Sequence, residues 1–282
     1  MNNGFWEELK QKFFRSGSPV MLYIGINAVL FIVISLVSVT LLLSGKGSIV
    51  DELVDQYLAF PSGTELWLSR FYTVITYQFF HADFFHILFN MLWLYWMGQL
   101  LLDFIKPRQF HVIYIGGGIL GALFFAFIFN LIPVFKPFAD SMFLKGSSAA
   151  VMAIFTALVT LVPNYSIRLM FIGEVKIKYL LLAYILLDYI GIKSSNVGGH
   201  LAHLGGALFG FIYIKTLQHG TDLNEVFKKK PKMKVVRNEN QKKSGKTVDQ
   251  KEIDAILDKI SKSGYDQLTS KEKQTLFEAS KN

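Results

Sequence analysis

The sequence predicts an all-α membrane protein with six membrane-spanning helices, and two observations support that prediction. The chain has 282 residues, of which 52% are apolar and 26 are phenylalanine. A soluble domain of this size does not need so many large apolar side chains. A spanning helix requires roughly 20 apolar residues. The apolar residues gather into six runs of about this length or somewhat shorter, near residues 20–43, 84–105, 109–135, 147–163, 179–190 and 201–217.

The first 19 residues form a basic N-terminal segment, and the six runs define a core at residues 20–217. Between the first two runs lies a long connection, about residues 45–80, whose apolar residues are spaced for short amphipathic helices that lie half-buried in the outer leaflet. The fifth run is short. Its helix begins near Leu169 if the charged residues that precede the run lie at the bilayer surface.

Charge predicts the orientation and the nature of the tail. Lysine and arginine concentrate in the connections that become cytoplasmic when the N-terminus is inside, so both termini are expected in the cytoplasm. The net charge of +8 is concentrated after the last run, in a basic linker at residues 218–251. We interpret this linker as a segment lying along anionic lipid and expect no nucleic-acid partner.

The chain ends in a predicted small helical hairpin, residues 252–282, which is cytoplasmic in this topology. Gly264 suits a helix end, and Thr269 with Glu272 resembles a capping box. The chain has no cysteine. Disulfides, thiol catalysis and cysteine metal sites are therefore excluded.

Polar residues in the second run are the first functional signal. His86 and Asn90 are four residues apart and share one helix face, while His81 lies just before that helix. Such residues can be structural hydrogen-bonding partners between helices, which membrane helices commonly use. Polar side chains in hydrocarbon are nevertheless costly, so the set is also a functional-site hypothesis.

A serine and a histidine in later runs favour the functional interpretation. Ser148 opens the fourth run and His203 lies in the sixth. Both runs carry small residues at four-residue spacing, so their helices can approach closely and bring Ser148 within reach of His203. The small residues are Ala149, Ala153 and Ala157 in the fourth run and Ala202, Gly206 and Gly210 in the sixth.

A hydroxyl beside an imidazole is an activated nucleophile, because the ring accepts its proton as the oxygen attacks. His86, Asn90 and the backbone N–H of Ser148 could stabilise the oxyanion. The runs that carry Ser148 and His203 contain no Asp or Glu. We therefore predict a Ser-His dyad.

These residues resemble the rhomboid family of intramembrane serine proteases. The resemblance rests on the order and spacing of three motifs, and it covers about residues 20–217. It implies a six-helix rhomboid-like bundle in which Ser148 is the nucleophile, His203 the general base, and His86 with Asn90 the oxyanion donors. The motifs are His81, His86 and Asn90; Gly146, Ser147 and Ser148; and the AHLGGALFG segment that holds His203. His81 and Gly146 would support the cavity.

The chain also departs from the family pattern. Ala149 follows the serine where the family usually has glycine, and Met152 stands where a tyrosine often packs on the histidine. Trp67 and Arg70 are not the adjacent pair frequently seen, and Asp103 is the candidate for an acidic residue near the end of the second helix. None of these changes removes a reacting group.

Alternatives exist inside the motifs. Ser147 is rotated by about 100 degrees from Ser148 on a helix, which turns it off the face that meets the sixth helix. His200 could be the base, but we expect it to contact the outer loop or water. The zinc-protease motif H-E-x-x-H is absent from the sequence, so we expect no metal and no other cofactor.

We therefore expect a multi-pass protein, in a bacterial inner membrane, that cleaves single-pass membrane proteins within the lipid bilayer. The alternative is an inactive rhomboid-like protein that binds membrane helices. The sequence does not indicate the oligomeric state.

Overall fold

The computed structural model describes residues 4–47, 49–170, 172–194, 196–222 and 249–280. The chain divides into two compact units, Met1–Lys228 and Lys229–Asn282. Each unit is described by itself.

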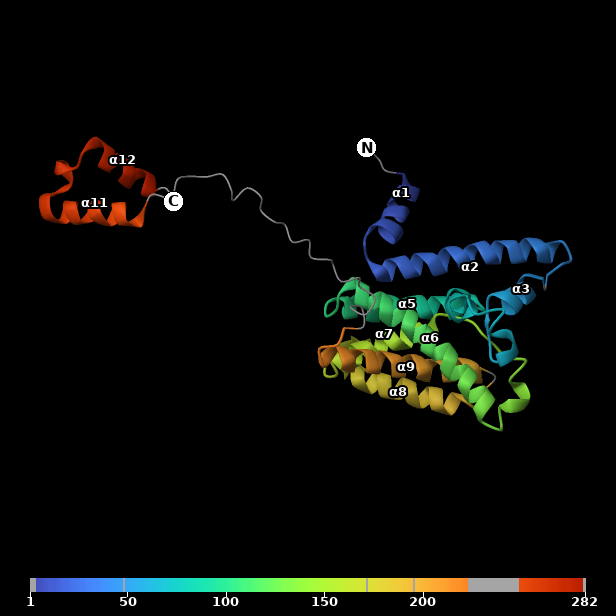
Figure 1. Cartoon of the computed structure of the whole chain (residues 1–282). Coiled ribbons are helices and arrows are strands. Elements are labelled where there is room, and N and C mark those ends of the chain that lie inside the picture. Colours follow the sequence, from blue (N-terminus) through green and yellow to red (C-terminus); the bar gives the residue numbers. More distant parts are fainter. Residues whose placement is uncertain (1–3, 48, 171, 195, 223–248, 281–282) are drawn as a thin grey trace. The chain divides into compact units, whose positions relative to one another are not determined.

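Each of the six apolar runs forms a helix in the first unit. Figure 1 shows that α7 lies within the bundle, where it packs against α5, α6 and α9. The six helices are α2 (Pro19–Leu43), α5 (Phe84–Leu102), α6 (Pro107–Leu131), α7 (Ser148–Leu161), α8 (Ile177–Gly191) and α9 (Val197–Gln218). They are preceded by α1 (Phe5–Lys10) and η1 (Gln11–Arg15).

Length separates these helices into two groups. Among the described residues, α2, α5, α6 and α9 are long and apolar enough to cross a membrane. Helix α7 has 14 residues and α8 has 15, against the roughly 20 that a full crossing requires. Four candidate spans are therefore present, and the expected count of six is not confirmed.

The long connection after α2 folds as short helices, as predicted. It contains α3 (Ile49–Tyr57), η2 (Thr64–Leu66), α4 (Thr73–Thr76) and η3 (Tyr77–Phe79). It also contributes β1 (Phe60–Pro61), which pairs antiparallel with β2 (Phe143–Leu144), the strand after η4 (Lys136–Phe138). The connection is thereby attached to the segment that leads into α7.

The prediction that the fifth helix could begin near Leu169 is wrong. Residues Ser166–Leu169 and Gly173–Lys176 form an antiparallel hairpin, β3 and β4, and α8 begins only at Ile177. Alternating polar and apolar residues, as in Ser-Ile-Arg-Leu, suit a strand better than a helix. Gly173 has φ +87°, a turn conformation that glycine adopts without steric cost.

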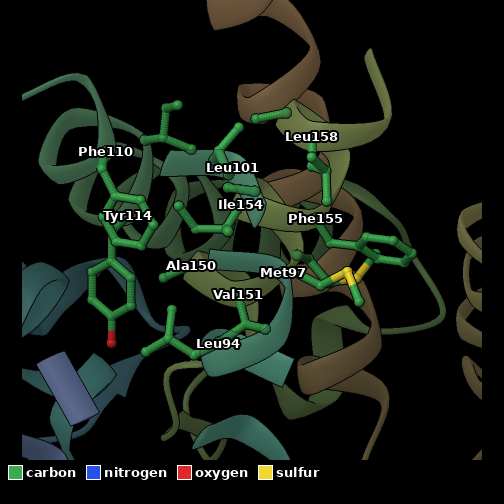
Figure 2. Close-up of a cluster of buried hydrophobic side chains, with 14 of the residues drawn as sticks. Leu94, Met97, Leu101, Phe110, Tyr114, Ala150, Val151, Ile154, Phe155 and Leu158 are labelled. Carbon is green, nitrogen blue, oxygen red and sulfur yellow. The ribbon is translucent and has the colours of Figure 1, made fainter. Parts of the chain in front are cut away.

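The core of this unit is centred on α7. Figure 2 shows Leu94 and Leu101 of α5, Tyr114 of α6 and Ile154 of α7 in one buried cluster. Eleven of the 14 residues of α7 are buried, which fixes its position in the bundle.

The predicted small-residue faces do meet. A Cβ atom on Gly206 would overlap the carbonyl oxygen of Ala149, and one on Gly210 would overlap that of Ala153. Helices α7 and α9 are therefore in backbone contact, which only small residues allow.

The second unit contains α11 (Gln250–Ser263), η6 (Tyr265–Gln267) and α12 (Ser270–Ala279). Thr269 and Glu272 form the expected capping box, and Gly264 ends α11 with φ +83°. Lys259 lies 2.9 Å from Glu272. Hydrogen bonds from Lys259 and from the backbone N–H of Thr269 lower the pKa of the Glu272 carboxyl to about 2. Most of the predicted basic linker, residues 223–248, lies outside the described residues.

Candidate active site

A cavity of about 520 Å³ opens where α5, α7, α8 and α9 converge. Ser148 and His203 both line it, together with His86 and Asn90. Its other lining residues are Asp83, Phe85, Phe89, Trp93, Lys145, Val151, Met152, Phe155, Tyr184, Asn196 and Gly199. The cavity is thus a polar cluster with mainly aromatic and aliphatic walls, which is the usual composition of a ligand site.

Ser148 is the first residue of α7, and the turn before it depends on glycine. Gly146 has φ +117°, and a Cβ atom there would lie 2.7 Å from the imidazole of His86. Only glycine fits both the backbone and the space. The N–H of Gly146 donates to the carbonyl of Tyr77 at 3.0 Å, which ties the turn to the long connection.

The two neighbouring serines have different surroundings. Ser147 is fully buried, and its Oγ lies 3.1 Å from Nε2 of His81, whereas Ser148 lines the cavity. The two serines are therefore distinct, and Ser147 is the N-cap residue before α7 and not part of the helix.

His81 contacts the turn that leads into α7, through the residue before Ser148. Its Nε2 is close to both the hydroxyl and, at 3.4 Å, the N–H of Ser147. Burial lowers the pKa of His81 to about 3, and the neighbouring His86 adds to the effect. His81 is therefore neutral at physiological pH, so Nε2 can accept the Ser147 N–H.

His86 and Asn90 lie on the face of α5 that borders the cavity. Asp83 caps this helix by accepting the N–H of His86 at 2.9 Å. Asn90 is 7% exposed, and its Nδ2 has no hydrogen-bond partner within the described part of the chain. A buried donor without a partner is costly and is rare in proteins. This amide can therefore serve an acceptor that enters the cavity.

The N-terminus of α7 adds a further donor. The first N–H groups of a helix have no intrahelical acceptor, and the helix dipole places partial positive charge there. Because Ser148 opens α7, its backbone N–H is one of these groups.

His203 makes a contact that the sequence analysis missed. Its Nδ1 lies 2.8 Å from Oδ1 of Asp188, which is in α8. Nδ1 of His200 lies at the same distance from the same oxygen. This contact of His200, whose side chain is 23% exposed, was not predicted from the sequence. The missed signal was a single carboxylate in the apolar run at residues 179–190.

Ser148 and His203 do not form a hydrogen bond with each other among the described residues, although both line the cavity. Catalytic hydrogen bonds are often long in unliganded enzymes. Tyr184 contacts the His203 ring edge-on, with ring centroids 6.0 Å apart. Met152, which replaces the tyrosine usual in the resembled family, lines the same cavity.

The ligand atoms of Asp188, His200 and His203 lie within 4.8 Å of one another, and their types would suit a transition metal. Both Nδ1 atoms, however, already face the carboxylate at hydrogen-bond distance. A hydrogen-bonded network is therefore a sufficient explanation of this cluster.

Comparison with known proteins gives two family matches. A model of the Rhomboid domain matches residues 68–219. Residues 239–282 match a family of unknown function (DUF6576).

Curated proteins of similar sequence carry related names. RHOMBOID-like protein 12, mitochondrial, of Arabidopsis thaliana is 29% identical over 162 residues, which are 54% of this chain and 48% of that protein. Presenilin-associated rhomboid-like protein A, mitochondrial, of Danio rerio is 26% identical over 52% of this chain and 37% of its own length. A Bos taurus presenilin-associated rhomboid-like protein, mitochondrial, is 28% identical over 48% and 35%. This chain thus spans about half of these relatives or less.

Proposed function

This chain belongs to the rhomboid family, and from that premise we propose that it is an intramembrane serine endopeptidase. The observation that carries the proposal is that Ser148, His203 and the unpartnered amide of Asn90 line one cavity. A nucleophile, a base and an oxyanion donor are the groups that acyl transfer requires.

In the proposed reaction, Ser148 Oγ attacks the carbonyl carbon of a peptide bond while His203 accepts the hydroxyl proton. The carbonyl oxygen becomes an oxyanion. Asn90 Nδ2, His86 and the backbone N–H of Ser148 are the proposed donors to it. Loss of one such donor typically costs about 10²–10³ in kcat.

The tetrahedral intermediate then collapses. The C–N bond breaks, and His203 returns its proton to the departing amine, which leaves an ester between Ser148 and the remaining fragment. Water attacks that ester, and His203 accepts a proton from the water and gives it to Ser148 as the second fragment leaves. Protons and electrons balance over the cycle, and no cofactor takes part.

We propose single-pass membrane proteins as substrates. The carbonyl groups of a helix are already hydrogen-bonded, so the segment must unwind before Ser148 can reach it. Glycine, proline or polar residues near the cleaved bond lower the cost of unwinding.

The protein is an integral membrane protein. We further propose that α7 and α8 complete six membrane helices within a core of residues 20–217 and that both termini are cytoplasmic. The curated relatives are named as mitochondrial proteins. They therefore do not support the expectation of a bacterial inner membrane.

The test compares wild type, Ser148→Ala, His203→Ala and Ser147→Ala, purified in detergent, on a generic transmembrane substrate. We expect Ser148→Ala and His203→Ala to lose cleavage and fluorophosphonate labelling. Ser147→Ala is the matched control, since it removes the neighbouring hydroxyl, and it should keep most activity. If wild type neither cleaves nor labels, the proposal fails in favour of an inactive rhomboid-like protein that binds membrane helices.

A further inference from the structure

Asp188 is a buried carboxylate that the proposed reaction does not yet use. Its side chain is 3% exposed, and it lies in α8, a helix otherwise rich in apolar residues. A carboxylate in such surroundings is costly unless it is hydrogen-bonded. Its Oδ1 faces Nδ1 of both His200 and His203 at 2.8 Å.

This geometry favours one position for the proton on each ring. An ionised carboxylate only accepts hydrogen bonds, so both Nδ1 atoms must be the donors. A neutral imidazole has one N–H, and its other nitrogen then carries a lone pair. For His203, that nitrogen is Nε2, and a lone pair there is what a base facing Ser148 requires.

We propose that Asp188 is a positioning residue that keeps His203 protonated at Nδ1, so that Nε2 can accept the Ser148 proton. This inference rests on the proposed function and changes the predicted dyad into a triad assembled from α7, α8 and α9. The negative carboxylate would also stabilise the imidazolium that forms as Ser148 attacks. In the well-studied soluble serine proteases, replacing the equivalent carboxylate by an amide lowers kcat by about 10⁴, because the histidine adopts the wrong tautomer.

His200 has a supporting part in this arrangement. Oδ2 of Asp188 has no partner among the described residues, so Oδ1 makes both of the hydrogen bonds found for this carboxylate. The N–H of His200 therefore helps to offset the cost of burying the charge. His200 itself does not line the cavity that holds Ser148.

The first experiment does not depend on activity. The full-length protein, labelled with ¹⁵N-histidine in detergent, is studied by NMR, which distinguishes a protonated ring nitrogen from an unprotonated one. A His203→Ala spectrum identifies the His203 signals. We expect His203 to carry its proton on Nδ1 in wild type and to lose that preference in Asp188→Asn. A wild-type proton on Nε2, or an unchanged preference in Asp188→Asn, would overturn the proposal.

The second experiment measures cleavage. Asp188→Asn should lower kcat by about 10²–10⁴ with little change in KM, and Asp188→Glu should recover part of the loss. Asp103→Asn is the matched control, because it removes an exposed carboxylate just after the far end of α5. Thermal unfolding shows whether each variant folds. Wild-type kcat in Asp188→Asn, or a loss fully explained by unfolding, would overturn the inference. A wild type without activity would instead refute the proposed function, and the NMR result would still decide the role of Asp188.

Discussion

Helices α7 and α8 both border the cavity, but they are held in the bundle in different ways. Helix α7 buries eleven of its 14 residues and meets α9 backbone to backbone. Helix α8 buries three of its 15, namely Ile177, Leu181 and Asp188. Several of its large apolar side chains are exposed, among them Leu187 at 65% and Ile190 at 67%.

This difference separates two tasks within one site. The helices that carry Ser148 and His203 are fixed by close packing, which leaves their relative position little freedom. Two of the contacts that hold α8 to α9 are polar, from Asp188 to His200 and His203. In the proposed site, close packing would therefore position Ser148 and His203, whereas a hydrogen bond from the less buried helix α8 would set the tautomer of His203.

Among the substitutions that test this comparison, Gly146→Ala is expected to have the largest effect, because it alters the turn that leads into the closely packed helix α7. A Cβ atom here would push on His86, a proposed oxyanion donor. We expect kcat/KM to fall by about 10²–10³ in a cleavage assay. The control is Gly173→Ala, which also has positive φ but no atom within 4 Å of the added Cβ. An equal loss of activity in both variants would mean that backbone strain alone is responsible.

The second prediction compares a substitution in the close contact between α7 and α9 with one on the exposed face of α8. Gly206→Ala would force α9 away from the Ala149 carbonyl, and overpacking of this kind costs about 1–3 kcal/mol. Leu187→Ala on α8 removes an exposed side chain and should change the free energy of unfolding by about 0.5 kcal/mol or less. Reversible unfolding in detergent measures both. Similar values for the two variants would contradict the division between the helices.

The third expected effect depends on pH and concerns His81, which contacts the turn before α7. Burial lowers its pKa from 6.5 to about 3. Between pH 6.5 and 3, His81 binds a proton in the unfolded chain but not in the folded chain. The free energy of unfolding therefore decreases as the pH falls from 6.5 towards 3. Between pH 7.5 and 4.5, wild type should lose about 2–3 kcal/mol of unfolding free energy more than His81→Gln does.

The pH dependence of unfolding in detergent measures this effect. His219→Gln, at an exposed position after α9, controls for the loss of a histidine as such. Equal pH dependence in wild type and His81→Gln would show that His81 is not the group responsible.

Sequence patterns predicted the features that depend on long stretches or strict spacing. All six apolar runs became helices, and the small-residue faces of α7 and α9 meet as expected. Ser147 and Ser148 do differ in their surroundings, but Ser147 is the N-cap before α7 and not part of the helix. These features are local, or they leave a helix only one way to pack.

Several other features that depend on tertiary contacts or on local strand patterns were missed. Asp188 is 15 residues from His203 in sequence, and only the packing of α8 on α9 brings them together. The hairpin of β3 and β4 was overlooked because its charged residues were interpreted as a bilayer boundary rather than as an alternating strand pattern. The unpartnered state of Asn90 Nδ2 likewise depends on every neighbour in the cavity.

Trimming the protein to the span that the Rhomboid domain model matches, residues 68–219, would remove β1 and Ser62. Ser62 donates its backbone N–H to the carbonyl of Met142, and Phe60 lies opposite Leu144, two residues before Gly146. A fragment cut at these borders would leave β2 without its partner strand and remove one of the contacts that hold the segment leading into α7. A fragment that keeps this strand pairing must therefore begin upstream of Phe60, outside the span that the domain model matches.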